Sequence, residues 1–198
     1  MDRLKGKVAG ITGATRGIGL KTAELLSARR VDEGKAIERR LGVNTMFVRT
    51  DVLIEEEIAN LVRSSVERFG KVDAFFCNAG SGGVLQKISE IDEPEFDRSV
   101  AILLKNVFFC YKHVTNQMRL NGGGSIVANA SVAATLGGFS SHFYSALKAA
   151  VVSLSRSVAI EVAEDNIRVN TVSPGGIATG IFGKSRGMSD ADADLAAV

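Results

Sequence analysis

Three glycines near the start of the chain constrain its fold more than any other feature. They follow an apolar run at residues 8–11 with the spacing G-x-x-x-G-x-G, at Gly13, Gly17 and Gly19, and residues 20–26 then have helical spacing. The pattern predicts a buried strand, a glycine-rich turn and a helix. Such a turn lets backbone N–H groups approach an anion at the positive end of the helix. The spacing is neither G-x-G-x-x-G nor a P-loop, so an ordinary glycine-rich turn remains an alternative.

The composition is that of a soluble globular protein, which we expect to form one domain over residues 1–198. Hydrophobic residues make up 45% and charged residues 23% of the chain, and the net charge of +2 gives no indication of a nucleic-acid partner. Cys77 and Cys110 favour core thiols in a reducing compartment, and two histidines give little support to a metal site. We found no apolar run of transmembrane length and no signal peptide, so we expect a cytoplasmic protein without a membrane partner.

Strand-like apolar runs alternate with helical patterns along the chain. The expected strands are residues 8–11, 45–51, 72–77, 125–129 and 167–172, and the expected helices are residues 20–29, 30–40, 55–69, 96–120 and 143–163. Most of the strands are apolar on both faces, which predicts a three-layer α/β/α, doubly wound, mostly parallel sheet. Ligands bind at the carboxyl ends of the strands in such sheets, and the unusual loops of this chain all fall there.

Two of these loops lead to residues with the chemistry for carbonyl and alcohol redox reactions. Tyr144 and Lys148 lie four residues apart near the start of a helix, so they share one face. We expect the lysine ammonium to lower the pKa of the phenol, which is about 10 in a free tyrosine. Ser131 ends the preceding strand and can present a hydroxyl donor to the same crevice. Taken singly, a Y-x-x-x-K pair usually covers a solvated face and a serine there is usually a local cap.

The whole ordered set resembles the classical short-chain dehydrogenase/reductase family over about residues 3–190. The matching motifs are T-G-A-T-R-G-I-G at residues 12–19, Asp51, N-A-G at residues 78–80, Ser131, Y-S-A-L-K at residues 144–148 and P-G-G-I-A-T at residues 174–179. The step of thirteen residues from Ser131 to Tyr144 also suits the family. Together these motifs are highly specific, whereas each alone is weak.

The resemblance implies a role for each matching residue. Tyr144 would be the acid–base group, Ser131 would hold the substrate oxygen, and Lys148 would bind the nicotinamide ribose and lower the pKa of the tyrosine. The hydride would pass directly between the nicotinamide and a secondary alcohol or ketone. The implied cofactor-binding residues, for NAD or NADP, are Gly13, Thr15, Arg16, Gly17, Ile18, Gly19, Asp51, Val52, Asn78, Ala79, Gly80, Tyr144, Lys148, Pro174, Gly175, Ile177 and Thr179.

One departure from the family concerns a catalytic asparagine in the long helix before Ser131. Counting back from Tyr144, that position is Leu103, and Asn106 lies three residues further on roughly the same helix face. We therefore expect a proton relay through Lys148 to be either absent or rerouted through Asn106.

Further departures concern missing elements and the choice of cofactor. The family's second strand has no counterpart, because residues 28–30 lead directly into a charged helical segment. The family's last helix and last strand also have no counterpart, so these elements are either deleted or omitted from the sequence. The loss of the second strand would leave the adenine pocket open. Arg16 favours NADP weakly, because it could pair with a 2′-phosphate, and Asp32 is a weaker candidate for an NAD-selecting acid.

The resemblance makes an NAD(P)-dependent oxidoreductase the leading hypothesis. The alternative from another class is a non-catalytic dinucleotide-binding or regulatory protein with the same fold, and a dehydratase or epimerase ranks last. A small alcohol or carbonyl compound is the expected substrate, in a pocket shaped by residues 81–94 and the segment after Ile181. Phe139, Phe143 and Phe182 would make this pocket apolar. The resemblance also implies a homo-oligomer, a dimer or tetramer, formed by the two long helices.

Overall fold

The computed structural model describes residues 4–27, 42, 44–177 and 179. Its strands are β1 (Ala9–Ile11), β2 (Ala74–Cys77), β3 (Gly124–Asn129) and β4 (Ile167–Val172), and its helices are α1 (Gly17–Ser27), α3 (Glu55–Phe69), α4 (Glu93–Val100), α5 (Asn106–Leu120) and α6 (His142–Glu161). A π-helical segment, Ala101–Lys105, joins α4 to α5. The strands and helices that the sequence predicts from residue 55 onward are therefore all present.

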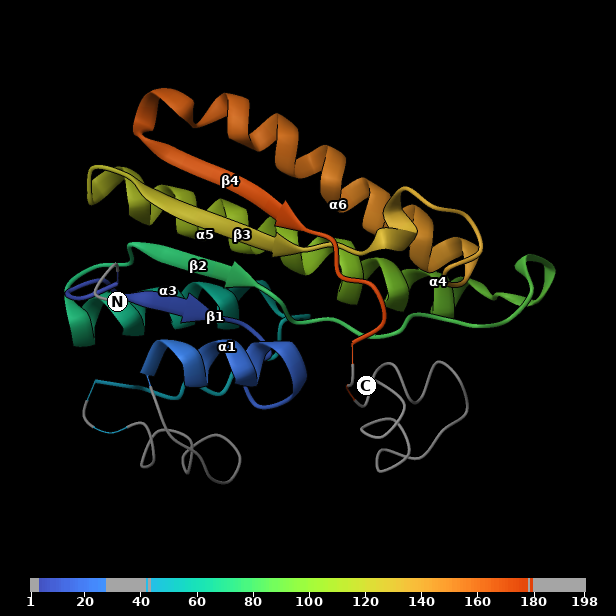
Figure 1. Ribbon diagram of the computed structural model, residues 1–198, viewed down its shortest axis with the longest axis horizontal. Coiled ribbons are helices and arrows are strands. Elements are labelled where there is room, and N and C mark those ends of the chain that lie inside the picture. Colours follow the sequence, from blue (N-terminus) through green and yellow to red (C-terminus); the bar gives the residue numbers. More distant parts are fainter. Residues whose placement is uncertain (1–3, 28–41, 43, 178, 180–198) are drawn as a thin grey trace.

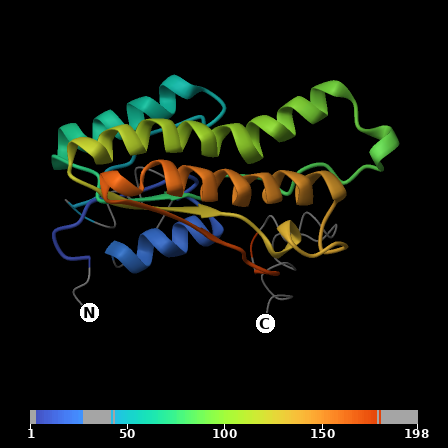
Figure 2. The ribbon, with the colours of Figure 1, turned by 90° about the horizontal axis from the view of Figure 1, so that it is seen from above.

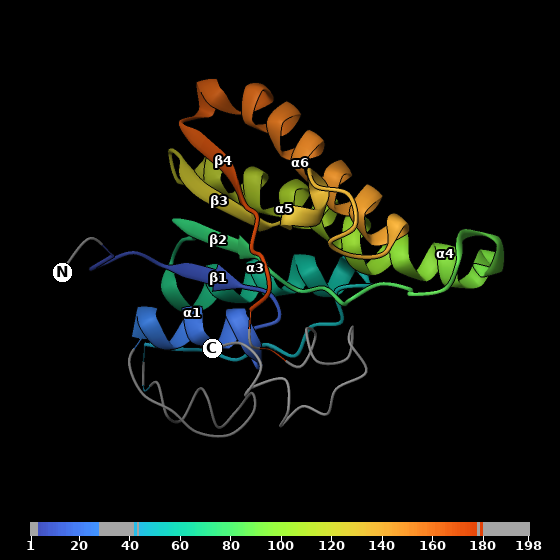
Figure 3. The ribbon, with the colours of Figure 1, turned by 45° about the vertical axis from the view of Figure 1, so that its right-hand side comes forward.

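The four strands form one parallel sheet in the order β1-β2-β3-β4. Ala74 of β2 lies beside Ala9 of β1 and Ser125 of β3, and Ile126 of β3 pairs with Val169 of β4. Within the described part of the chain, β3 thus has neighbours on both sides while β1 forms an edge of the sheet (Figure 1 and Figure 3). The sheet is Rossmann-like, and it confirms the predicted α/β fold class.

Helices cover both faces of the sheet, which gives three layers. Figure 2 shows α3, α5 and α6 on one face and α1 on the other. The core lies between the sheet and the three-helix face, where residues such as Ile58, Val114 and Val151 have no exposed surface. Helix α3 follows the amphipathic pattern of the sequence and ends at Gly70, whose φ of 83° terminates it in the left-handed conformation.

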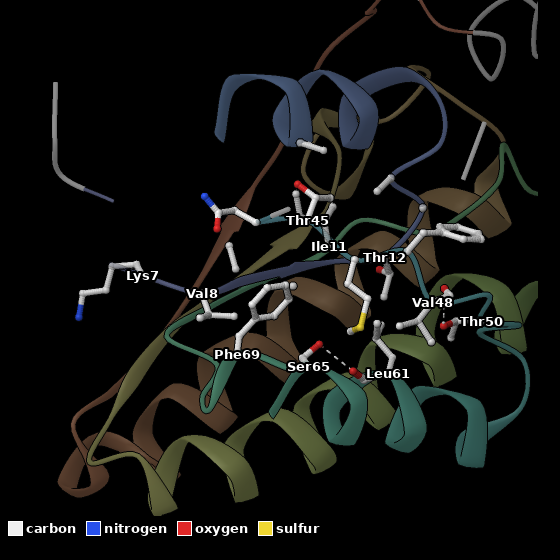
Figure 4. Close-up of a pocket in the computed structure, with 18 of the residues that line it drawn as sticks. Lys7, Val8, Ile11, Thr12, Thr45, Val48, Thr50, Leu61, Ser65 and Phe69 are labelled. Carbon is white, nitrogen blue, oxygen red and sulfur yellow. Dashed lines mark hydrogen bonds between the residues drawn. The ribbon is translucent and has the colours of Figure 1, made fainter. Parts of the chain in front are cut away.

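The predicted strand at residues 45–51 is wrong, because these residues form no ladder with any described strand. A hollow of about 840 Å³ lies beside β1 and this segment, and we call it the β1 hollow. Leu61, Ser65 and Phe69 of α3 also line it (Figure 4). Because no described strand lies beside the segment at hydrogen-bond distance, its local β propensity is not sufficient to make a strand. The helix expected at residues 30–40 lies outside the described residues.

The helix predicted at residues 96–120 is also described differently by the structure. It begins three residues earlier, as α4, because the Asp92 side chain caps it by accepting from the Glu95 N–H at 2.8 Å and Pro94 occupies the first turn. The π-helical segment then separates α4 from α5. Such bulges are frequent at functional sites, and this one faces the residues described below.

Helix α6 is long and apolar enough to cross a membrane, judged by length and composition alone. The expectation that no apolar run reaches transmembrane length is therefore wrong for this helix. Core helices of soluble proteins pass the same test, and α6 buries Leu147, Val151 and Ser155 against the rest of the fold.

Candidate active site

The loops that the sequence singled out gather at one end of the sheet. All four strands point the same way, and the segments after β2, β3 and β4 leave from their carboxyl ends (Figure 1). The backbone N–H of Val132, just after β3, donates to the carbonyl of Pro174, just after β4, at 3.0 Å. The two loops are therefore joined directly, as expected for a crevice at the carboxyl ends of the strands.

The glycine turn joins β1 to α1 and needs its glycines for two reasons. Gly13 and Gly17 have φ angles of 66° and 52°, which side-chain-bearing residues rarely adopt. A Cβ on Gly19 would stand 2.4 Å from the carbonyl oxygen of Gly13. A Cβ on Gly17 would stand 3.0 Å from Cγ2 of Thr179, so the segment after β4 returns to this turn. The turn leaves backbone close to solvent at the start of a helix, as a phosphate cradle requires.

Asn78 fastens the glycine turn to the end of β2. Its Nδ2 donates to the carbonyls of Thr12 and Gly13, at 3.0 and 3.3 Å. The Thr12 hydroxyl in turn accepts from the backbone N–H groups of Asn78 and Ala79, at 3.0 and 3.1 Å. Thr12 is buried, so the bonds to its hydroxyl are partly shielded from water, whereas the bond to the Gly13 carbonyl is exposed. Together the bonds hold the turn against the end of β2.

Ser131 and Tyr144 come together although the 3-10 turn and loop of residues 132–141 separate them. Ser131 follows β3 and its hydroxyl accepts from the Ala133 N–H at 3.2 Å. Tyr144 lies in the first turn of α6, which Ser141 caps by accepting from the Tyr144 N–H at 3.4 Å. Burial raises the pKa of Tyr144, and a hydrogen bond with the Ser131 side chain opposes this shift. The phenol is therefore protonated at neutral pH in this structure.

Lys148 lies one turn further along α6, with its side chain buried against the ends of β2 and β3. The residue is 5% exposed, and its Nζ lies 5.7 Å from the centroid of the Tyr144 ring. Nζ donates to the carbonyl of Asn129 at 2.7 Å. Burial lowers the pKa of Lys148 to about 8. The expectation that this lysine lowers the pKa of Tyr144 is wrong here, because burial of the phenol dominates and raises its pKa.

The position that resembles the family's catalytic asparagine is closed by an apolar side chain. Leu103 is 1% exposed and belongs to the π-helical segment. A Cβ on Gly80 would stand 3.6 Å from Leu103 Cδ2 and 4.0 Å from Lys148 Nζ, so leucine and lysine border the same glycine. The Nδ2 of Asn106 donates to the carbonyl of Ile102, in the π-helical segment that precedes α5. The structure therefore gives no support to a relay rerouted through Asn106.

The remaining predicted cofactor residues lie in the glycine turn, beside the β1 hollow, or in loops at the carboxyl ends of the strands. Thr15 lines the β1 hollow, as does Val52. Asp51 is exposed and its carboxylate accepts from the Leu53 N–H at 2.9 Å, so in the structure it acts as a local turn residue before α3. The other predicted positions lie in the glycine turn or in the loops after β2 and β4, namely Arg16, Ile18, Ala79, Gly80, Pro174, Gly175 and Ile177.

The structure also shows residues that the sequence reasoning missed. Asn129, the last residue of β3, donates from Nδ2 to Oδ1 of Asn78 at 3.0 Å, while its carbonyl accepts from Lys148. The Oδ1 of Asn129 is buried and has no partner among the described residues, a state that costs about 1–3 kcal/mol. Gly83, with φ 70°, packs its backbone against Tyr144 and Leu103. The sequence does contain a feature that could have pointed to Asn129, because this amide side chain ends an otherwise apolar strand.

The fold and this geometry agree with what comparison with known proteins finds. The family described as short chain dehydrogenase matches residues 7–190. Secoisolariciresinol dehydrogenase of Forsythia intermedia is 36% identical, over 95% of this chain and 72% of its own. Momilactone A synthase of Oryza sativa subsp. japonica is 39% identical, over 95% of this chain and 73% of its own.

Solved structures with the same arrangement include two reductases. Levodione reductase superposes with a TM-score of 0.84 at 31% identity, covering 92% of this chain and 76% of its own. A 3-ketoacyl-(acyl-carrier-protein) reductase from Brucella melitensis, complexed with NADH, also has a TM-score of 0.84 at 28% identity and covers 98% of this chain and 90% of its own. The chain therefore belongs to the short-chain dehydrogenase/reductase family and is an NAD(P)-dependent oxidoreductase.

Proposed function

We propose that the protein interconverts a secondary alcohol and a ketone, with Tyr144 as the acid–base group. The observation that carries this proposal is the cluster of Ser131, Tyr144 and Lys148. The Ser131 side chain lowers the pKa of Tyr144 against the effect of burial, and the lysine ammonium lies 5.7 Å from the tyrosine ring. Such a cluster beside a glycine turn combines a proton donor, a hydroxyl for a substrate oxygen and a cation.

The residues that would hold the cofactor fit a dinucleotide. Gly13, Gly17 and Gly19 let the turn pack closely against the protein, because a Cβ at these positions would be strained or would clash. The turn leads into the start of a helix, where backbone N–H groups would hold a pyrophosphate. Pro174, Gly175, Ile177 and Thr179 would border the nicotinamide, and nothing lies within 4 Å of a Cβ built on Gly175. The Lys148 ammonium would also donate to the nicotinamide ribose. When bound, the nicotinamide supplies or accepts the hydride.

The protein's own groups would manage the proton. In the reducing direction the protonated Tyr144 Oη would give its proton to the carbonyl oxygen, which the Ser131 hydroxyl would hold in place. In the oxidising direction the phenolate would accept the proton of the alcohol. A pKa raised by burial keeps Tyr144 protonated at neutral pH, so this environment favours reduction near pH 7 and oxidation at alkaline pH.

The substrate would enter beside the loop at residues 81–94. Phe143, next to Tyr144, stacks on Phe96 of α4 with ring centroids 4.5 Å apart. Gly83 brings the loop against the tyrosine itself. These contacts favour a small substrate with an apolar body near the reacting carbon.

Replacing Tyr144 with phenylalanine tests this assignment. We expect Tyr144→Phe to lower kcat by about 10²–10⁴-fold on a panel of ketones and secondary alcohols, because the proton donor is removed while the ring remains. Tyr111→Phe is a matched control, since this tyrosine is the other one in the chain and its hydroxyl bonds to Ser155 at 2.6 Å in the core. Equal turnover by Tyr144→Phe and wild type would rule the mechanism out.

A second candidate function is dinucleotide binding without turnover. Two observations favour it, namely the apolar Leu103 beside Lys148 and the β1 hollow. This candidate predicts cofactor binding by the wild-type protein with no turnover of any alcohol or ketone on the panel. Cofactor binding measured by fluorescence, together with the turnover assay, separates the two functions.

We further propose that the protein forms a homo-oligomer through α5 and α6. Phe108 of α5 and Ile160 of α6 are 50% and 80% exposed, which is unusual for large apolar side chains on neighbouring helices. Light scattering of the purified protein measures its mass in solution, and a monomer at micromolar concentration would contradict the proposal.

A further inference from the structure

Asn129 occupies the point where the two halves of the candidate site meet. It is the last residue of β3, between β2 on one side and β4 on the other. Its side chain reaches β2, where Nδ2 donates to Oδ1 of Asn78 at 3.0 Å. Its backbone carbonyl accepts from the Nζ of Lys148 at 2.7 Å. One residue therefore contacts both the support of the glycine turn and the lysine of α6.

The chemistry of Asn78 requires a hydrogen-bond donor at position 129. Both carbonyls of the glycine turn that Asn78 contacts are acceptors, so its Nδ2 must face them. Its Oδ1 then points away from the turn and can only accept. The Nδ2 of Asn129 supplies that donor, whereas an aliphatic side chain would leave the Asn78 oxygen without it.

The orientation of the Asn129 amide leaves part of its own hydrogen-bonding capacity unused. With Nδ2 directed at Asn78, its own Oδ1 is buried and has no partner among the described residues. Native structures rarely keep such an atom unless the arrangement serves another purpose. Here the amide holds Asn78 while fixing the end of β3, from which the carbonyl toward Lys148 projects.

The contact with Lys148 is short and shielded. A bond of 2.7 Å from an ammonium to a carbonyl is a charge-assisted hydrogen bond, and the lysine is 5% exposed. Leu103 and Gly80 border the same part of the lysine, so they offer it no side-chain acceptor. Among the described contacts, the titratable group beside Lys148 is Tyr144, whose ring centroid lies 5.7 Å from Nζ.

We propose that Asn129 is a positioning residue that couples the glycine turn to Lys148, so that one side chain sets both cofactor affinity and the environment of the lysine. The proposal rests on the proposed function for its catalytic meaning. Its physical content, a link between Asn78 and Lys148 through the end of β3, holds for the protein without ligand as well.

Two substitutions of Asn129, one without and one with a hydrogen-bond donor, test the proposal. Asn129→Leu removes the donor to Asn78, while Asn129→Thr keeps a hydroxyl donor on a side chain that suits a strand. Asn170→Leu is the control, because Asn170 is an exposed residue of the neighbouring strand β4. Thermal unfolding of each variant first establishes that it is folded.

The readouts are the dissociation constant of NADH and NADPH and the titration of Lys148. The titration uses protein labelled with ¹³C at lysine Cε and studied without cofactor, with Lys148→Arg assigning the signal. We expect Asn129→Leu to weaken binding of the preferred cofactor about tenfold and to move the Lys148 midpoint by at least about half a pH unit. Asn129→Thr should stay within about threefold of wild type in affinity and keep the midpoint.

The proposal is overturned if the leucine and threonine variants share one dissociation constant and one Lys148 midpoint, whether or not these equal the wild-type values. Identical shifts in both would mean that Asn129 only fills the end of the strand. The titration needs no turnover, so a wild-type protein that lacks redox activity would contradict the proposed function and leave this test intact.

Discussion

The two ends of the sheet differ in how completely they are built. At the β3 end, six residues pair with β4 and four with β2, and the core residues Ile126 and Ala128 are fully buried. At the β1 end, three residues pair with β2, no other described strand pairs with them, and a hollow of about 840 Å³ lies along the other side. The groups proposed for chemistry stand on the complete end, whereas the adenosine end of a dinucleotide would fall beside the hollow.

The difference teaches that catalytic geometry and cofactor affinity are carried by separate parts of this molecule. Ser131, Tyr144 and Lys148 are placed by β3 and α6, which contact the rest of the fold on several sides. The glycine turn depends on a three-residue strand and on the bonds from Asn78. We therefore expect the catalytic residues to be held firmly in place, and the adenosine part of the cofactor to be bound weakly.

The largest expected effect is in amide hydrogen exchange. Val8 and Thr12 bond to β2, so the alternating residues between them, Ala9 and Ile11, direct their backbone groups to the edge that has no neighbour among the described strands. We expect the amides of these two residues to exchange at least about a thousandfold faster than those of Ile126 and Ala128. Equal protection at both ends, measured by NMR in D₂O, would show that the β1 edge is covered and would remove the basis of the comparison.

A substitution in the glycine turn comes next. Gly19→Ala would place a Cβ 2.5 Å from the Nδ2 of Asn78 as well as close to the Gly13 carbonyl, so the turn must move. We expect the cofactor dissociation constant to rise by roughly a hundredfold, since a phosphate cradle is distorted. Gly137→Ala is the control, because nothing lies within 4 Å of its Cβ. Unchanged affinity in Gly19→Ala, by fluorescence titration, would place the cofactor elsewhere.

A smaller effect is expected on stability, because the pKa of Lys148 makes the free energy of unfolding depend on pH. Its folded pKa of about 8 is below the ordinary value of 10.5, so between these pH values the unfolded chain binds a proton that the folded chain does not. The free energy of unfolding should therefore rise with pH in this window, by at most about 1.4 kcal/mol per pH unit. Urea denaturation between pH 8 and 10 should show this rise in wild type and a flatter profile in Lys148→Met. Parallel profiles would mean that the lysine is not buried as described.

The sequence predicted the complete end of the molecule better than the open end. Helix α3 and strand β4 have the predicted limits, because their apolar periodicity agrees with the burial they find in the fold. The segment at residues 45–51 has the same local β propensity, but a strand also needs a neighbour, and no local pattern shows whether one is present.

The candidate site shows the same limit of sequence reasoning. Ser131 and Tyr144 were identified from the ordered motifs and the family that these resemble, and the structure brings the two residues together. The pKa of Tyr144 could not be predicted, because burial depends on the loops that cover the phenol and opposes any effect of Lys148. Asn129 was missed because its importance lies in two contacts that are distant in sequence, with Asn78 and Lys148.

The most direct test of the difference between the two ends is the affinity for a whole dinucleotide relative to half of one. Reduced nicotinamide mononucleotide lacks the adenosine part, so the ratio of its dissociation constant to that of NADH or NADPH reports what the β1 end contributes. We expect the preferred dinucleotide to bind no more than about tenfold more tightly, equivalent to about 1.4 kcal/mol. A preference of a thousandfold or more would contradict the account, because the adenosine end would then be a complete binding site.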